Sequence, residues 1–282
     1  MNFLSQLGGE LRKLFGRQRT YLGYIVFLVM EAIILLVFKL PGSQRTMRTL
    51  IETNGFGFDE YYSSLTVTYW VMGFSMFLLG SIYFALVAGD IVAKESEDGN
   101  LRLVLARPVS RLRILLLKYA AVSIYTVSFV IFVGVTGYLM SVIALGFDGG
   151  LFVWNYKMKV FSAFATWGDG MGRIAMAALG IGISMITLSS IAFMFSCFKM
   201  KPAAATIVAL SILFVDLVLQ EFPFFRPYEQ YFVTWRMSNW VYLLENTISW
   251  PKIAGSYAFL FGLNATLFLI GFTAFRLRDF KT

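Results

Sequence analysis

Two carboxylates, Glu31 and Asp216, interrupt stretches of the chain that are otherwise apolar. An ionisable side chain at membrane depth is costly to bury, so it is a candidate for contact with a substrate or a water-filled cavity. No Lys or Arg lies in the same stretches, so each carboxyl group is either protonated or faces water. The alternative for both residues is an interhelical hydrogen bond that fixes packing. A pathway role for Asp216 and Glu31 therefore stands as a hypothesis beside that structural alternative.

Other residue types that could do chemistry are scarce. The chain has no histidine and a single cysteine, Cys197, which excludes catalysis or metal binding by His and any site built from several Cys. It has no G-x4-G-K-[ST] loop, so it cannot hold ATP phosphates in that way. We therefore predict no catalytic residues, no metal site and no cofactor bound by this chain.

The composition indicates whether the folded chain is surrounded by water or by lipid. Of 282 residues, 58% are hydrophobic and only 14% are charged, whereas a soluble domain carries about 25% charged residues. This much apolar surface requires lipid, so we predict an all-α integral membrane protein. The net charge of +8 would suggest nucleic acid in a soluble protein. Here we attribute it to loops that set membrane orientation, and we predict no nucleic-acid partner.

Six stretches approach the roughly 20 apolar residues that a membrane-spanning helix needs. Together they predict a single transmembrane domain over residues 1–282. The third is long enough that one end should project into water, or Gly134 and Gly137 should permit a bend. The predicted spans are 21–38, 68–88, 114–145, 171–195, 203–219 and 253–275.

The distribution of basic residues predicts the orientation of these spans. If both termini are cytoplasmic, the inner segments hold 15 Lys and Arg in 61 positions and the outer segments hold 9 in 90. This excess has the direction that the positive-inside rule requires. We therefore predict cytoplasmic termini, and an uncleaved first span because residues 1–19 are too charged for a signal sequence.

Residues 1–19 have an amphipathic pattern. Leucines recur at spacings of three and four residues, and Glu10, Arg12, Lys13 and Arg17 take the other positions. A helix of this kind lies in the membrane interface rather than crossing the bilayer. The alternative is a soluble helix that packs on a partner.

The segment between the second and third predicted spans contains a short helical pattern over 96–108. Leu101, Val104 and Leu105 form an apolar face with charged residues beside it, and Pro108 ends the pattern. The helix is too short and too charged to enter the bilayer, so its leucines need a soluble cover. A cytosolic partner protein is the simplest cover.

The same segment resembles the signature loop of type-2 ABC transporter permeases, whose pattern is roughly E-x3-G-T-L-x3-L-A-x-P-V-S-R with a lysine further on. Asn100 replaces the usual threonine. The ending Phe275-Arg-Leu-Arg-Asp-Phe and the short inner turn 198–202 also resemble the family. The residues that carry the loop pattern are Glu95, Gly99, Leu101, Leu105, Ala106, Pro108, Val109, Ser110, Arg111 and Lys118.

This resemblance implies an architecture and a set of partners. Residues 3–17 match an interfacial elbow helix, and Gly99–Arg107 match a coupling helix between the second and third of six spans. The implied partners are a cytosolic ABC ATPase subunit, which would bind ATP and Mg²⁺, and a second permease copy. The implied location is a bacterial cytoplasmic (inner) membrane. The residues expected to couple to the ATPase are Glu95, Gly99, Leu101, Arg102, Leu105, Arg107, Pro108 and Arg111.

Two further segments leave alternatives open. The outer segment 220–252 is dense in aromatic residues, which predicts short interfacial or re-entrant helices. It serves either as an anchor or as a lid that binds an amphiphilic substrate. In the fourth span, Ala178 with Gly182 and Gly180 with Ser184 form small-xxx-small pairs, which bring helices together within one protomer or across a dimer.

Three functions compete at this point. The leading one is the permease subunit of an ATP-driven exporter coupled through 96–108. A second is a transmission subunit that acts on an extracytoplasmic partner without moving a substrate. A third is a channel or secondary carrier outside the ABC class, although the chain shows neither an inverted repeat nor a span interrupted by proline.

Overall fold

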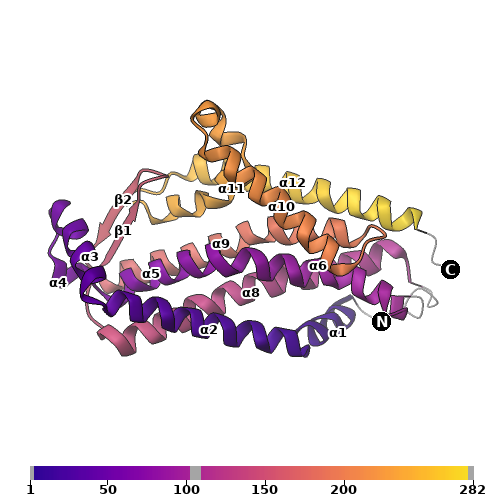
Figure 1. The fold of residues 1–282 in the computed structure, drawn as a ribbon, viewed down its shortest axis with the longest axis horizontal. Helices are drawn as coiled ribbons and strands as arrows, with labels where there is room; N and C mark the ends of the chain where they lie inside the picture. The colour runs from indigo at the N-terminus through magenta and orange to yellow at the C-terminus, as the bar shows by residue number, and fades with distance from the viewer. Residues whose placement is uncertain (1–2, 102–108, 279–282) are drawn as a thin grey trace.

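The computed structural model describes residues 3–101 and 109–278, which form a helical bundle (Figure 1). Within this part, five helices are long and apolar enough to cross a membrane. They contain five of the six predicted spans, those at 21–38, 114–145, 171–195, 203–219 and 253–275. The five are α2 (Gln18–Lys39), α8 (Arg111–Leu145), α9 (Trp167–Ser196), α10 (Pro202–Glu221) and α12 (Trp250–Leu277).

The remaining predicted span, 68–88, lies in a helical run of three parts. These are α5 (Ser64–Ser75), the π-helical turn η1 (Met76–Gly80) and α6 (Ser81–Glu97). No part alone has the length of a span, which is why this segment is not among the five. In Figure 1, α5 and α6 lie in line along the bundle. The packing partners change at the turn, because α5 packs mainly against α8 and α6 mainly against α9 and α10.

The amphipathic segment at the N-terminus forms α1 (Phe3–Phe15). Leu14 is buried, and Leu7, Leu11 and Phe15 pack against the main core. A Cβ atom added to Gly8 or Gly9 would meet nothing within 4 Å. The apolar side of α1 is therefore covered mainly by α8 of the same chain.

Helix α9 is the centre of the bundle and packs against α6, α8, α10 and α12. Its small residues are used within the protomer. A Cβ atom on Gly182 would lie 3.3 Å from Val127 Cα, and one on Gly180 would lie 2.7 Å from Leu243 Cδ1. These two glycines therefore let α8 and the segment before α12 approach α9. Helix α8 is continuous for 35 residues and runs through Gly134 and Gly137 without interruption.

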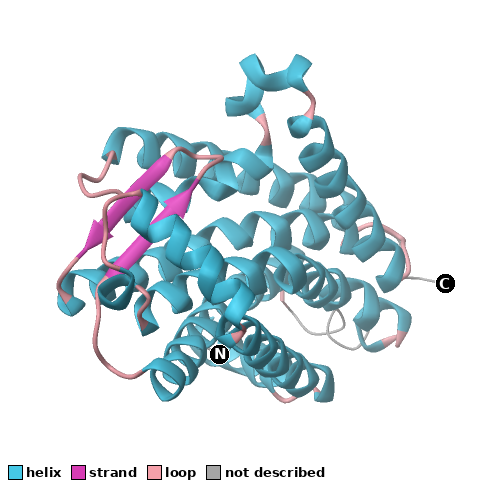
Figure 2. Ribbon diagram, turned by 60° about the vertical axis from the view of Figure 1, so that its left-hand side comes forward, coloured by secondary structure: helices cyan, strands magenta, loops and turns pink. Residues whose placement is uncertain are grey.

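One end of the bundle, which we call the hairpin end, carries a small outer layer. It contains α3 (Pro41–Thr53), α4 (Phe58–Tyr61) and a β-hairpin of β1 (Leu151–Asn155) and β2 (Val160–Phe164), with Leu151 opposite Phe164. Figure 2 shows the two strands lying against the helices at this end. The prediction of a purely helical protein missed this hairpin, although helices make up nearly all of the described fold.

The aromatic segment 220–252 forms short helices, as predicted from its composition. They are the 3₁₀ helix η2 (Pro223–Tyr231), α11 (Val233–Ser238) and the 3₁₀ helix η3 (Asn239–Leu244). Figure 1 shows that α10 rises out of the bundle, so that the turn after it protrudes. The aromatic residues of this segment fall into an exposed group and a group packed in the bundle. Phe224, Tyr228 and Tyr231 are exposed, whereas Trp235 and Trp240 pack against the core.

Candidate functional site

The end of the bundle opposite the hairpin is where α6 ends and α8 begins, and we call it the loop end. Four predicted coupling residues, Glu95, Gly99, Leu101 and Arg111, lie in the described part of the chain at this end. The others, Arg102, Leu105, Arg107 and Pro108, lie outside the described residues, as does most of the predicted coupling helix 96–108.

A group of four charged side chains joins α1, α6 and α8 at the loop end. Lys118 of α8 lies between two carboxylates, with its Nζ 2.6 Å from Glu95 Oε2 and 3.0 Å from Glu10 Oε2. Lys13 Nζ lies 2.7 Å from Glu10 Oε1 and 3.9 Å from Glu95 Oε1. The Lys118 side chain is 2% exposed and that of Lys13 is 52% exposed. We call this group the four-charge cluster; its two positive and two negative charges balance.

The four-charge cluster affects the titration of Glu10. Burial raises the pKa of Glu10, but the ammonium groups of Lys118 and Lys13 outweigh it and hold the pKa below the ordinary value of 4.5. A carboxyl group with a lowered pKa stabilises the fold above its unfolded pKa, and this stabilisation is lost as the pH falls through the folded pKa.

Stability should therefore be lost on the acid side. We expect the melting temperature in detergent to be nearly constant between about pH 7 and 5, and to fall below about pH 4.5. Thermal scans across this range check the expectation. Glu10→Gln should be less stable near neutral pH and should show a weaker acid dependence. An unchanged acid profile in Glu10→Gln would contradict it.

Two arginines tie the loop end to the last helix. Arg111 donates hydrogen bonds to the backbone carbonyls of Arg276 at 2.7 Å and Arg278 at 3.2 Å, which lie at the C-terminus of α12. Terminal carbonyls of a helix lack intrahelical donors and attract positive charge. Arg278 in turn donates to Ser96 Oγ at 2.8 Å and to the Phe198 carbonyl at 3.1 Å. The loop pattern, the inner turn and the C-terminal pattern thus meet at one place.

Leu101 has a different environment from the one predicted. It is 1% exposed and belongs to the same buried cluster as Leu14 and Leu115. The expectation that this leucine is presented to the cytosol is therefore wrong. An apolar face in a sequence shows that something covers it, but not whether the cover is a partner or the chain itself.

Gly99 has a backbone conformation that favours glycine. Its φ angle is +74°, in the left-handed region, and it follows the last residues of α6. A larger side chain would not clash at this position, because a Cβ atom there would contact nothing within 4 Å. The backbone angle alone therefore requires glycine, or Asn as the best substitute.

The carboxylate of Glu31 lies between two spans. Glu31 is fully buried, and its Oε1 accepts a hydrogen bond from Thr136 Oγ1 of α8 at 3.0 Å. Its Oε2 has no hydrogen-bond partner in the described part of the protein. This geometry matches the structural alternative, a bond that joins α2 to α8. The pathway role of Glu31 remains a prediction.

Asp216 organises the segment that follows its own helix. Its carboxylate accepts hydrogen bonds from the backbone nitrogens of Val233, at 3.2 Å, and Thr234, at 2.8 Å, and from Thr234 Oγ1 at 2.6 Å. It therefore caps the N-terminus of α11, where backbone N–H groups lack intrahelical acceptors. It also lines a pocket with aromatic residues of η2 and its end, among them Phe225 and Tyr228. A pathway role for Asp216 remains a prediction too.

Sequence reasoning missed part of this site. It placed Glu10 and Lys13 on a polar helix face without assigning them a partner. It also missed the ion pair between Arg19 and Asp90, at 2.5 Å, which joins the start of α2 to α6. A usable signal was the presence of Lys118 and Asp90 in predominantly apolar helices, because a buried charge requires a partner.

The fold and the loop-end site define a multi-pass helical membrane protein with a charge-anchored connection after its second hydrophobic segment. This chain belongs to the ABC-2 family of transporter proteins, whose family model matches residues 3–224. Membership supports a transmembrane permease of the ABC transporter class. The chain is also similar to the "Uncharacterized protein YhcI" of Bacillus subtilis (strain 168), with 27% identity over 119 residues. That match covers 42% of this chain and 38% of the relative.

Proposed function

We propose that this permease is driven by a separate cytosolic ATPase and exports its substrate across a bacterial cytoplasmic membrane. In this proposal, the run from α5 to α6 is the second of six spans and α1 is an interfacial elbow helix. Both termini are cytoplasmic, and two copies of the chain form the translocating unit. The ATPase subunit binds ATP and Mg²⁺.

The observation that carries the proposal is the anchoring of both ends of segment 96–108. Just before it, Glu95 is ion-paired to Lys118 of α8. Just after it, Arg111 is bonded to the end of α12. A force on this segment therefore acts directly on α8 through Lys118 and on α12 through Arg111. It also acts on α1, because Lys118 is paired with Glu10 of that helix. Such attachment is what a coupling element requires.

Within the segment, the residues take different roles. Arg102, Leu105, Arg107 and Pro108 are the proposed contacts with the ATPase. Leu101 belongs to the buried core, so we propose that it anchors the segment instead of docking.

Affinity purification from native membranes tests this proposal. Full-length tagged protein, extracted in mild detergent, should retain an ATPase subunit with a phosphate-loop motif, together with a second permease copy. Leu105→Asp should lose the ATPase while keeping the elution profile of the assembled membrane part. Leu112→Asp, at an exposed leucine of α8 that is not part of the loop pattern, is the matched control. Purification of the wild type alone, under conditions that preserve other ABC complexes, would contradict ATPase coupling.

Substitution of Gly99 should weaken the same contact. A β-branched residue is strained by about 1–2 kcal/mol in the left-handed region. Gly99→Val should therefore lower the retained ATPase by roughly 5- to 30-fold if the strain is relieved by displacing the segment. Gly99→Asn should retain it, because Asn tolerates this backbone conformation. Quantitative mass spectrometry of the complexes measures both; equal retention in the two variants would exclude a role for this turn.

A second candidate function is transmission of ATP-driven motion to an extracytoplasmic partner. The observations in its favour are the outer layer at the hairpin end, with the exposed Tyr156 of the hairpin turn, and the exposed Phe224 in the turn that protrudes after α10. Reconstitution of permease and ATPase alone in proteoliposomes separates the two functions. ATP-dependent movement of a candidate substrate supports export, whereas ATP hydrolysis that requires an outer partner supports transmission. Family membership leaves no support for a carrier outside the ABC class.

A further inference from the structure

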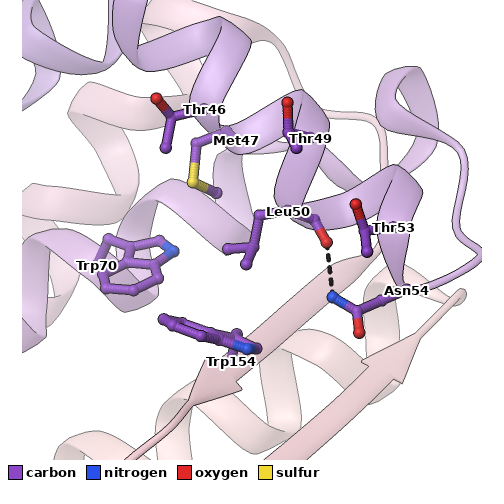
Figure 3. Close-up of a pocket in the computed structure, with 8 residues that line it drawn as sticks. All are labelled: Thr46, Met47, Thr49, Leu50, Thr53, Asn54, Trp70 and Trp154. Carbon is purple, nitrogen blue, oxygen red and sulfur yellow. Dashed lines mark hydrogen bonds between the residues drawn. The ribbon is translucent and has the colours of Figure 1, made fainter.

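An apolar pocket at the hairpin end is not used by the proposed function. It lies between α3, α5 and β1 and has a volume of about 550 Å³, within the range of small-molecule sites. Figure 3 shows Met47 and Leu50 of α3 on one side of this pocket and the indole rings of Trp70 and Trp154 on the other. Most of the lining is therefore hydrocarbon and aromatic surface.

Three polar side chains around the pocket already donate hydrogen bonds within their own helix or its end. The hydroxyl groups of Thr46 and Thr49 each donate to the backbone carbonyl four residues earlier, at 3.1 and 3.0 Å. The Asn54 amide does the same at 2.6 Å (Figure 3). They therefore leave their methyl groups and carbon atoms as the accessible lining, so an occupant needs hydrocarbon rather than a set of hydrogen-bonding groups.

One donor in the pocket is unsatisfied. The Nε1 atom of Trp70 is buried and has no hydrogen-bond partner in the part of the chain that the structure describes. Figure 3 shows this nitrogen on the side of the indole that faces Leu50. A buried donor without an acceptor is unfavourable. An apolar ligand with one acceptor oxygen would therefore suit the pocket, because that oxygen could bind Trp70 Nε1.

An exposed aromatic ridge adjoins the pocket at Trp70. Trp70, Phe74 and Phe77 follow one another at helical spacing on one face. Trp70 and Phe74 are stacked with ring centroids 5.5 Å apart, and Phe74 and Phe77 are exposed. This aromatic ridge leads from the pocket along the second hydrophobic segment, so a chain from the bilayer can enter without crossing water.

The depth of the pocket also fits a lipid. Helix α3 begins at Pro41, two residues after the apolar helix α2 ends at Lys39, so the pocket lies at the boundary of the hydrocarbon layer. Tryptophan prefers this level of the membrane. We propose that the pocket holds one hydrocarbon chain of a membrane amphiphile, with an ester carbonyl of that molecule accepting a hydrogen bond from Trp70 Nε1. This inference requires only that the chain spans a membrane and does not depend on ATPase coupling.

Photolabelling of the full chain tests the site. The protein is reconstituted in nanodiscs containing a phospholipid with a diazirine on its acyl chain, and adducts are located by peptide mass spectrometry. Peptides with Leu50 and Trp154 should be labelled. Leu50→Trp, which fills the pocket, should lower labelling at Trp154 by about tenfold, as expected when contacts of roughly two methylene groups are lost. Glu52→Trp, on the other side of α3, should leave it unchanged.

A second variant removes the donor but keeps an aromatic ring at this position of the lining. Trp70→Phe should lower labelling by the ester lipid by about fivefold, with an unchanged elution profile in detergent. Lipids that copurify with wild type and Leu50→Trp identify the source. Loss of a common phospholipid indicates a resident membrane lipid, and loss of another amphiphile indicates a cargo molecule. Equal labelling of wild type, Leu50→Trp and Trp70→Phe would show annular lipid only and would overturn the proposal.

Discussion

Replacing Lys118 with methionine is expected to lower the free energy of unfolding by about 3–5 kcal/mol. The substitution preserves much of the side-chain volume but leaves the carboxylates of Glu10 and Glu95 beside one another without the ammonium group that lies between them. Two carboxylates that both contact one ammonium group lie close enough to repel each other when that group is removed, and neither carboxylate is well solvated. In a thermal scan of the full chain in detergent, we expect a decrease in melting temperature on the order of 10 °C.

Two controls separate loss of the charge from loss of packing. Lys13→Met removes the exposed cation of the four-charge cluster and should change stability little, because exposed ion pairs contribute about 0–1 kcal/mol. The triple variant Glu10→Gln/Glu95→Gln/Lys118→Met carries no charges at these three positions and should regain much of the lost stability. A triple variant as unstable as Lys118→Met would show that the lysine stem, not the charge balance, stabilises the loop end.

The second large effect is expected at Asp216. Asp216→Ala removes the acceptor for two backbone N–H groups and one hydroxyl group, so we expect a loss of about 2 kcal/mol. The loss should be local, with faster hydrogen exchange in η2 and α11 than in the rest of the bundle. Asp216→Asn retains an acceptor oxygen and should behave much more like wild type.

This pair of variants also decides between the two roles considered for Asp216. If Asp216→Ala and Asp216→Asn both retain normal exchange in η2 and α11 but impair transport equally, the carboxylate acts in the pathway and its capping role is minor. If only Asp216→Ala loosens the segment, and transport falls in proportion, Asp216 is a structural cap.

The membrane-spanning helices were predictable because hydrophobic length is a local property of the sequence. Each of the five long apolar helices contains one predicted span, and α1 follows the leucine spacing of residues 3–17. The loop pattern around Glu95 and Arg111 indicated the family, which the family model confirms, and the role of these residues stays a prediction. Local patterns were sufficient for these features.

Pairing between distant residues was not predictable in the same way. Lys118 and Glu10 are 108 positions apart, and no local pattern specifies that contact. The exposed role expected for Leu101 was wrong for the same reason, because the cover of an apolar face is a tertiary property. The hairpin 151–164 was missed because its first strand is buried on both faces, so it lacks the alternation that marks a half-buried strand.

The π-helical turn Met76–Gly80 divides the helical run from Ser64 to Glu97 into two pieces with different main packing partners. A π turn contains one more residue than an α turn, and its hydrogen-bond pattern can migrate along a helix by small backbone adjustments. Glu95, near the end of α6, is ion-paired to Lys118 of α8, and α6 packs mainly against α9 and α10, so a displacement at Glu95 acts on all three of these helices. A shift of the π turn can therefore change the register of α6 against α9 and α10 without requiring α5, which carries Trp70, to leave its main packing against α8.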